Sequence, residues 1–390
     1  MTEVVLAGAV RTPIGKFLGG LKDVPAPELG AVVAKEALAR AHVAPGDVDE
    51  VVLGEVLQAG VGQNPARQVA LKAGLPPSVA AFTVNKVCGS SLKAVMLAAA
   101  AIRAGDAEVV LAGGMESMTR APHLLRAREG VRYGDGKLVD ALQHDGLVDA
   151  FYGMPMGVTG EVVAAEFGVT REEADAFAAR SHKRAAAAQS SGRFKEEIVP
   201  VTVPGKKPVV VSEDEGIRPD TTVEGLSRLR AAFQEGGVVT AGNSSQMSDG
   251  ASAVVVASRE AARRHGMDVL GVVEAYGTVG VEPRRVMAAP IEGVKALMDR
   301  AGLRTRDLGL FEHNEAFATA SVAVQRACDV PDDSFNVNGG AVALGHPLGA
   351  SGARVLTTLL HEMRRRGVER GLSTLCLGGG NAVTMVVRRP

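Results

Sequence analysis

The chain contains only three cysteines, Cys88, Cys328 and Cys376. Three cysteines provide no disulfide framework of the kind that small secreted proteins use. The apolar run at residues 4–10 is too short to span a membrane, and it lacks the basic start and cleavage region of a secretory signal. We therefore expect a cytoplasmic protein in a reducing compartment, without a membrane span.

The chain also lacks an excess of charge of either sign, since 43 Lys and Arg stand against 44 Asp and Glu, a formal net charge of −1. This balance gives no global field that would attract nucleic acid or an anionic membrane. An acidic substrate would have to be held by local groups. The 390 residues, 46% of them hydrophobic, are enough for a large core and two or three folding units.

Two parts of the chain resemble each other at an offset of roughly 260 residues. Residues 37–55 and 297–315 share a helix end, a turn containing aspartate and an apolar run that ends in glutamate. Residues 109–114 and 375–379 are both apolar runs that end in glycines. This alternation of helices and buried strands predicts an α/β unit with a largely parallel sheet, present twice. Residues 4–10 predict a further buried strand.

A different segment, residues 118–245, lies between the two copies and is rich in charge and turns. It contains an amphipathic helix predicted over 172–190, announced by Thr170 and Glu173, which form a capping-box pattern. We interpret this segment as an insertion over one edge of the core. The predicted domains are an N-terminal half (1–117 plus 246–268), an inserted loop domain (118–245) and a C-terminal half (269–390).

Cys88 is followed by small residues that lead into a helix predicted over 92–103. The dipole of a helix favours the thiolate at its N-terminus, which makes a cysteine nucleophilic near neutral pH. A buried cysteine that only fills space is the alternative, and this segment alone does not choose between the two. Cys328, in a helical stretch without glycine or polar neighbours, is predicted to be such a filler.

His346 lies in a glycine-rich segment, residues 345–352 (Gly-His-Pro-Leu-Gly-Ala-Ser-Gly), before a helix predicted over 353–366. A histidine between glycine and proline lies at a turn, which favours a general base or hydrogen-bond donor over a core histidine. A phosphate loop is disfavoured because its Lys-Ser/Thr ending is absent. A dinucleotide site is disfavoured because no Gly-x-Gly-x-x-Gly follows a first strand.

Cys376 ends a predicted buried strand, and the three glycines at 378–380 can offer backbone N–H groups as an oxyanion hole. Zinc bound by Cys88, His346 and Cys376 is disfavoured because paired Cys-x-x-Cys or His-x-x-x-His ligands are absent, so we expect no metal. Asn314 follows the apolar run of the second copy. It either caps a helix or fixes a water or a carbonyl group.

Together, these motifs resemble the thiolase family: Val-Cys-Gly-Ser-Ser around Cys88, Asn-Glu-Ala-Phe at 314–317, residues 345–352, and Cys-Leu-Gly-Gly-Gly at 376–380. The resemblance covers essentially the whole chain. It implies an α/β thiolase fold, a duplicated five-layer α-β-α-β-α core with an inserted loop domain. It also implies an acyltransferase that condenses acetyl-CoA with an acyl-CoA, or cleaves a 3-ketoacyl-CoA with coenzyme A. Coenzyme A would be a substrate and product, with no permanently bound cofactor.

The resemblance further implies a role for each motif. Cys88 would take the acyl group, with His346 deprotonating it. Cys376 would remove the α-proton of the second acetyl-CoA, or activate the coenzyme A thiol in the degradative direction. His346 and a water held by Asn314 would stabilise the enolate oxygen, and the backbone N–H groups of Cys88 and Gly378 would form a second oxyanion hole.

The substrate contacts implied by the resemblance come mainly from the inserted segment and the return of the chain to the core. They are Arg218, Leu229, Ala241 and Ser245 for coenzyme A, and Met156 and Phe317 for the acyl pocket.

Two features bear on chain length and assembly. Biosynthetic acetoacetyl-CoA thiolases often carry histidine directly before Met-Gly, whereas residues 154–157 read Met-Pro-Met-Gly. This difference leaves longer 3-ketoacyl chains, as in β-oxidation of fatty acids, as an alternative to the predicted acetoacetyl-CoA. Conversely, residues 131–137 resemble the loop through which such biosynthetic enzymes form tetramers. A homo-oligomer, either a dimer or a tetramer, is expected.

Two further alternatives are separated by Cys376. Decarboxylating ketoacyl synthases and hydroxymethylglutaryl synthases share the fold but lack the Cys-Leu-Gly-Gly-Gly ending, so Cys376 favours a thiolase. A non-catalytic acyl-CoA-binding protein would not require Cys88, His346 and Cys376 together.

Overall fold

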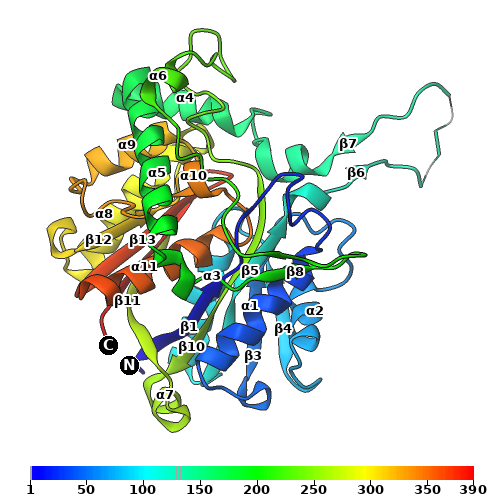
Figure 1. Ribbon diagram of the computed structural model, residues 1–390, viewed down its shortest axis with the longest axis vertical. Coiled ribbons are helices and arrows are strands. Elements are labelled where there is room, and N and C mark those ends of the chain that lie inside the picture. Colours follow the sequence, from blue (N-terminus) through cyan, green and yellow to red (C-terminus); the bar gives the residue numbers. More distant parts are fainter. Residues whose placement is uncertain (1, 129, 132) are drawn as a thin grey trace.

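One mixed β-sheet runs through the whole molecule, which we describe from a computed structural model covering residues 2–128, 130, 131 and 133–390 (Figure 1). Neighbouring strands follow the order β12-β13-β14-β11-β1-β10-β5-β3-β4. The pairs β3–β4, β3–β5 and β12–β13 are parallel, and the other pairs along this order are antiparallel. The strands are β1 (Val4–Arg11), β3 (Glu50–Gly54), β4 (Ala80–Val84), β5 (Val109–Ser117), β10 (Ser248–Ser258), β11 (Val269–Gly280), β12 (Leu310–His313), β13 (Arg370–Leu377) and β14 (Asn381–Arg388), with the short β2 (Gly15–Lys16) paired to β10.

The strand order is mirrored about the contact between β1 and β11. From β1 outward it reads β10, β5, β3, β4, and from β11 outward it reads β14, β13, β12, followed by a parallel bridge between Phe311 and Phe335 in the place that β4 holds. Such mirroring is what a duplicated unit produces, so the predicted duplicated α/β core is confirmed. The prediction of a largely parallel sheet is wrong, because β1, β10, β11 and β14 pair antiparallel with their neighbours in the middle of the sheet. The predicted strand at residues 4–10 is β1, which is buried along its length. The domain boundaries at 117, 245 and 268 stay predictions.

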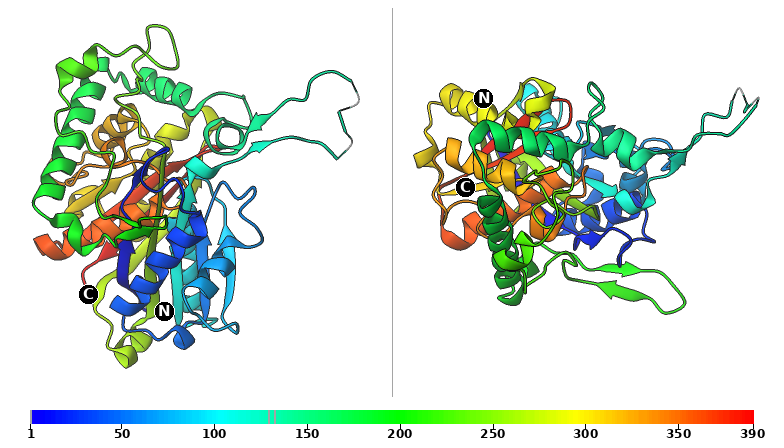
Figure 2. Two further views of the ribbon diagram at one scale, coloured as in Figure 1. Left: turned by 45° about the vertical axis from the view of Figure 1, so that its right-hand side comes forward. Right: turned by 90° about the horizontal axis from the view of Figure 1, so that it is seen from above.

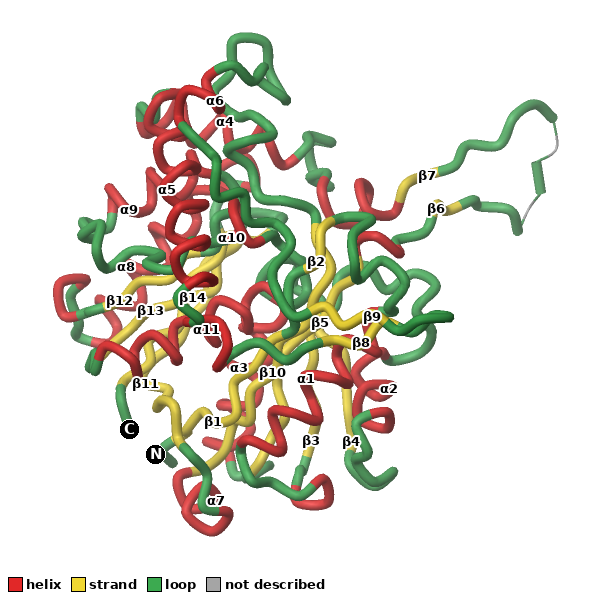
Figure 3. Tube along the Cα trace, in the orientation of Figure 1, coloured by secondary structure: helices red, strands yellow, loops and turns green. Residues whose placement is uncertain are grey.

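Two long helices lie in the middle of the molecule, α3 (Ser90–Ala104) and α11 (Ser351–Arg366), and pack against each other (Figure 3). The outer face of the first half is covered by α1 (Ala26–Arg40) and α2 (Pro65–Lys72), and that of the second half by α8 (Ala289–Ala301). Three helical layers therefore enclose the two halves of the sheet, which form the two strand layers. The remaining helices are α4 (Met156–Phe167), α5 (Arg171–Ser190), α6 (Val223–Ser227), α7 (Arg259–His265), α9 (Ala318–Ala327) and α10 (Ala341–Leu344).

The stretch Val87–Ala104, which contains α3, is long and apolar enough to cross a membrane by length and composition, and 56% of it is buried inside the protein. Leu92, Met96 and Ile102 of this helix belong to the same buried apolar cluster as Leu356 and Leu360 of α11. The apolar character of α3 is therefore explained by its place in the core.

The inserted segment packs mainly on the second half, where α4 and α5 contact α9 and α5 contacts α10. The capping box predicted for α5 is present, since Thr170 and Glu173 bond each other's backbone N–H groups. Two arms leave the body: one runs out from β6 (His123–Leu124) and returns through β7 (Val139–Asp140), and the other is the hairpin of β8 (Val201–Val203) and β9 (Val209–Val211) (Figure 2). The predicted tetramer loop lies in the first arm, and its Arg132 is outside the described residues.

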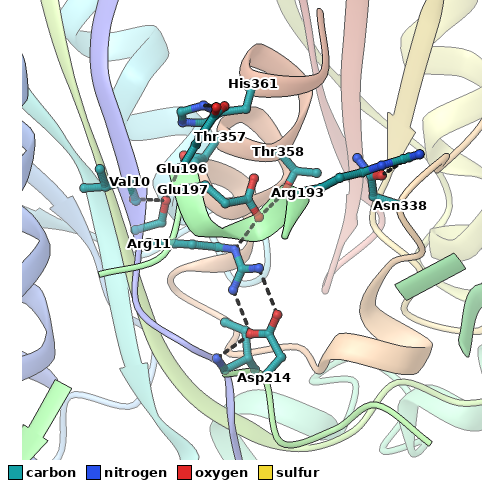
Figure 4. A network of polar contacts seen from close by, with 12 residues as sticks. Val10, Arg11, Arg193, Glu196, Glu197, Asp214, Asn338, Thr357, Thr358 and His361 are labelled. Atoms are coloured by element: carbon teal, nitrogen blue, oxygen red, sulfur yellow. Dashed lines mark hydrogen bonds and ion pairs between the residues drawn. The ribbon is translucent and has the colours of Figure 1, made fainter. Parts of the chain in front are cut away.

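A buried arginine attaches the inserted segment to the first strand (Figure 4). Arg11 Nε donates to Glu197 at 2.7 Å, and its two Nη atoms donate to Asp214 at 2.7 and 2.9 Å. Asp214 also accepts from the backbone N–H of Ile14 at 2.8 Å, and the Arg11 guanidinium lies 5.0 Å from the centre of the Phe194 ring. Glu197, Asp214 and Phe194 all belong to the insertion. One guanidinium therefore holds the part of the insertion that runs back over the core against β1.

We predict that Arg11→Met lowers the free energy of unfolding by about 3–5 kcal/mol, because it leaves two buried carboxylates without their cation. Denaturant unfolding measures this change. Arg228→Met is the matched control. It removes an exposed pair with Glu224 and should change the stability by less than about 1 kcal/mol. Equal effects of the two substitutions would contradict the importance of the buried pair.

Candidate active site

Two adjoining cavities lie where the inserted segment meets the two halves of the core. The outer cavity has a volume of about 700 Å³ and the inner one about 50 Å³. Both are lined by Met156, Ser245, Phe317, His346 and Leu348. The inner cavity is also lined by Cys88, Cys376 and Gly378. The structure therefore brings together the reactive residues of all the glycine-rich segments.

Cys88 lies directly before α3, whose N-cap is Gly89. Val87 has a φ of 46°, a left-handed conformation that costs energy for a β-branched residue and is typical of functional sites. The Gly378 backbone lies against this segment, since a Cβ on Gly378 would be 3.2 Å from Val87 Cγ1, and its N–H lowers the pKa of the Cys88 thiol. The nucleophile candidate of the first half is thus held against the glycine turn of the second.

Burial raises the pKa of the Cys88 thiol to about 12, although the N–H groups of Gly378 and of Cys88 itself act in the opposite direction. The expectation that the helix N-terminus makes Cys88 a thiolate near neutral pH is therefore wrong for the free protein. A helix dipole contributes about 0.3–1 kcal/mol, and the loss of solvation of a buried thiolate outweighs it. Cys88 needs a base at the moment of reaction.

His346 lines the inner cavity together with Cys88 and is the candidate for that base. Its Nδ1 lies 2.6 Å from the hydroxyl of Ser351, and this hydroxyl donates to the carbonyl of Pro347 at 2.8 Å. Because the hydroxyl proton is used there, Nδ1 carries the imidazole proton and Nε2 is left with its lone pair. Burial lowers the pKa of His346 to about 3, so the ring is neutral at physiological pH.

Asn314 lies beside His346, and its Nδ2 donates to the Nε2 lone pair at 3.3 Å in the free protein. Among the described residues its Oδ1 has no hydrogen-bond partner although it is buried. The following helix, α9, has Phe317 as its N-cap, so the alternative that Asn314 caps this helix is wrong. A buried carbonyl oxygen without a protein partner is a typical place for an ordered water.

Cys376 lies near the end of β13, and its sulfur is 3.6 Å from the sulfur of Met287. Burial raises its pKa, and the neighbouring Cys88 adds to this effect. The turn that follows needs glycine because Gly379 and Gly380 have φ values of 80° and 78°. Both thiols and the imidazole are thus neutral in the free protein.

The predicted substrate contacts divide into two groups. Four of them line the outer cavity, while Arg218 and Leu229 are not in its lining. Arg218 donates from its backbone N–H to His182 at 3.1 Å, and Leu229 is 40% exposed. The four that line the cavity are Met156, Ala241, Ser245 and Phe317.

The sequence patterns did not identify several residues of the site. Phe233 packs edge-on against Phe317 with ring centres 6.2 Å apart, and Met287 lines the inner cavity. Neither lies in a recognisable motif. Ser351, which orients His346, lies in the glycine-rich segment 345–352, and its spacing from His346 was the available signal. Cys328 packs in an apolar cluster at the end of α9, which confirms it as a filler.

Within the described part of the chain, no three or more His, Cys, Asp or Glu side chains form a group that could hold a metal ion. All three cysteines are free thiols. The two thiols, the imidazole and the glycine-rich turns can support proton transfer, covalent attachment at Cys88 and stabilisation of negative oxygen by backbone N–H groups.

Comparisons with known proteins agree with this geometry. The family descriptions "Thiolase, N-terminal domain" and "Thiolase, C-terminal domain" match residues 4–260 and 267–389. An acetyl-CoA acetyltransferase of Cupriavidus necator is 52% identical over 392 residues, and one of Chromobacterium violaceum is 51% identical over 391, with 100% of each chain covered. The crystal structures of a Bacillus anthracis acetyl-CoA acetyltransferase and of human mitochondrial 3-ketoacyl-CoA thiolase each superpose with a TM-score of 0.97. They are 40% and 39% identical, and each match covers 100% of this chain and 99% of the other.

We predict that alkylation of Cys88 by iodoacetamide in the free protein accelerates about tenfold for each pH unit between about pH 6 and 9. The reason is that its pKa is raised to about 12, so the thiolate fraction keeps growing over this range. Peptide mass spectrometry measures the rate at Cys88, with buried Cys328 as an internal control. A plateau near pH 7 would show that the thiol is acidic and would contradict the dominance of burial.

Proposed function

This chain belongs to the thiolase family and is an acyltransferase, and from that premise we propose that it interconverts two acetyl-CoA with acetoacetyl-CoA and coenzyme A through an acyl group on Cys88. The observation that supports this proposal best is the shared inner cavity of Cys88, His346 and Cys376. A Claisen condensation needs a covalent acyl carrier, a base for a weakly acidic C–H and two places that hold negative oxygen. We assign each of these to a residue of the cavity.

In the first half-reaction, His346 Nε2 takes the proton of the Cys88 thiol as the sulfur attacks the thioester carbonyl. The carbonyl oxygen lies against the backbone N–H groups of Cys88 and Gly378, and each such donor contributes about 3 kcal/mol to the transition state. When the bond to coenzyme A breaks, its thiolate takes the proton of Cys376. Acyl-Cys88, a protonated His346 and a Cys376 thiolate remain, and the coenzyme A thiol departs.

In the second half-reaction, the Cys376 thiolate removes the α-proton of acetyl-CoA. The enolate oxygen accepts from His346 Nε2–H and from a water whose other hydrogen is held by Asn314 Oδ1, which is without a partner among the described residues. The enolate carbon then attacks acyl-Cys88, and the departing Cys88 sulfur recovers the proton from His346. A positioned base contributes roughly 10²- to 10⁴-fold to such a step.

The small inner cavity supports a short acyl group. Its volume is about 50 Å³, and Met287 and Val286 line it beside Cys376. The relatives named acetyl-CoA acetyltransferase support the same substrate. A second candidate, a thiolase for longer 3-ketoacyl chains, is favoured by the larger outer cavity and by the missing histidine before Met156-Gly157.

Coenzyme A would enter through the outer cavity along Ala241 and Ser245, with Arg218 and Leu229 holding its distal part outside that cavity. It would be a substrate and product, with no cofactor bound permanently. We further propose that the protein works in the cytoplasm as a homo-oligomer, a dimer or a tetramer assembled through the arm between β6 and β7. The exposed Tyr133 and Leu138 of this arm support assembly there.

We predict that incubation with acetyl-CoA adds an acetyl mass to the wild-type protein but not to Cys88→Ala. Cys376→Ser should still become acetylated because Cys88 and His346 are intact, although more slowly because Cys376 no longer protonates the departing coenzyme A. Its condensation rate should fall at least about 100-fold. Intact-protein mass spectrometry and a coupled condensation assay measure these outcomes. Acetylation of Cys88→Ala would refute the nucleophile, and normal condensation by Cys376→Ser would refute the base.

We also predict that Met287→Ala raises kcat/KM for 3-ketohexanoyl-CoA relative to acetoacetyl-CoA by about tenfold or more, since the space for one methylene is worth about 1–3 kcal/mol. A thiolysis series across chain lengths measures this ratio. Met298→Ala is the matched control, because Met298 is equally buried but lies in another apolar cluster, away from both cavities. An unchanged ratio in Met287→Ala would show that Met287 does not limit the length of the acyl chain.

A further inference from the structure

The carboxyl group of Glu116, at the end of β5, is fully buried. Among the described residues, its hydrogen-bond donors are backbone N–H groups that belong to two other segments. Its Oε2 accepts from the N–H of Gly349 at 2.9 Å and of Val56 at 3.1 Å, and its Oε1 accepts from the N–H of Leu57 at 3.2 Å. A buried carboxylate is costly unless its oxygens are bonded, and these donors are its compensation. One side chain thus joins a strand end, the loop after β3 and the loop that carries His346.

Both bonded segments form the surroundings of the reactive residues. Val56, Leu57 and Leu348 belong to one apolar cluster, and Cys88 packs against it. Leu348 directly precedes Gly349 and lines both cavities. A movement of either segment would therefore change the place of Cys88 or the shape of the cavity beside His346.

The contact between Gly349 and Glu116 leaves no room for adjustment. A Cβ atom on Gly349 would lie 2.5 Å from the carbonyl oxygen of Met115, 2.8 Å from the Cα of Glu55 and 3.0 Å from Glu116 Oε2. The backbone of the His346 loop therefore rests directly on β5 and on the end of β3. The hydrogen bond from the Gly349 N–H to Glu116 fixes the height of this loop above the sheet, and the bonds from Val56 and Leu57 hold the loop after β3 to the same carboxylate.

We infer that Glu116 is a positioning residue, whose carboxylate holds the loops beside Cys88 and His346 in the geometry that acyl transfer requires. This inference rests on the proposed function, since acyl transfer at Cys88 is the step that it supports. Glu116 would touch neither substrate nor the reacting atoms. A misplacement of about 1 Å in such a support costs up to about 100-fold in rate.

The charges around Glu116 make its protonation visible in the pH dependence. Burial raises its pKa to about 7, with a further contribution from Asp249, and the three N–H donors act in the opposite direction. Glu55 also faces Glu116 and has a pKa raised to about 9. The charge of Glu116 in turn raises the pKa of the Cys88 thiol. Below about pH 7 Glu116 gains a proton and loses acceptor capacity toward its three donors, so activity should fall on the acid side.

The test is Glu116→Gln, which keeps the shape but replaces one acceptor oxygen by an NH₂ donor. We expect the kcat of thiolysis to fall about 10- to 100-fold, with KM for coenzyme A changed less than about twofold and the melting temperature retained. The acid limb near pH 7 should disappear from the kcat profile. If Glu116→Gln has the wild-type kcat and an intact acid limb, the inference is overturned. It is also overturned if Cys88 becomes acylated faster in this variant, because Glu116 would then act on Cys88 only through its charge.

Glu55→Gln is the matched control. Glu55 is as buried as Glu116, but within the described residues neither of its oxygens has a hydrogen-bond partner. Its substitution should leave kcat within about twofold and keep the acid limb, because Glu55 is already protonated near pH 7. A loss of the acid limb in Glu55→Gln would move the assignment away from Glu116.

If Glu116→Gln does not fold, the wild-type protein carries the test. Acetylation of Cys88 by acetyl-CoA, followed by mass spectrometry in rapid-quench samples, should be constant above about pH 8 and should slow as the pH falls through about 7, whereas alkylation keeps accelerating above pH 8. An acetylation rate that stays constant through this fall in pH overturns the inference. A wild-type protein that never becomes acetylated refutes the proposed function itself, so the two failures are distinguishable.

Discussion

The beginnings of α3 and α11 lie directly against each other, and this contact determines where the active site is. The N–H of Ala353 donates to the Ser91 hydroxyl at 2.9 Å, and a Cβ on Gly352 would lie 2.5 Å from the backbone nitrogen of Leu92. Only small residues permit this approach. Because Cys88 lies in the turn before Ser90, where α3 begins, and His346 in the loop before Ser351, where α11 begins, the contact at the centre of the duplication brings the two reactive groups into one cavity.

Burial of the reactive groups beside this contact sets the chemistry. Burial raises the pKa of Cys88 to about 12 and lowers that of His346 to about 3, so neither group is charged before substrate arrives. Charge separation then occurs only when backbone N–H groups can stabilise the negative oxygen of the substrate. A resting thiolate would be exposed to oxidation and alkylation, and the neutral state avoids this.

The cavity walls depend on a second constraint, the attachment of the insertion to the core. Met156 and Phe233 belong to the insertion, while Cys88 and His346 belong to the two halves. Arg11 holds the insertion against the core through Glu197 and Asp214. Ser245 is positioned by its backbone N–H, which donates to the carbonyl of Ala316 at 3.0 Å. The pocket is therefore a property of three segments that are distant in the chain.

The sequence by itself determined the duplication, the buried first strand, the capped helix α5 and the reactive residues at the glycine-rich turns. Each of these depends on local patterns: an apolar period, a cap, or glycines that a turn requires. Only the tertiary structure decided the ionisation of Cys88, the support by Glu116, the packing of Phe233 and Met287 around the cavities, and the place of Arg218 outside them. These depend on solvation and on contacts between segments far apart in the chain, and no local pattern encodes them.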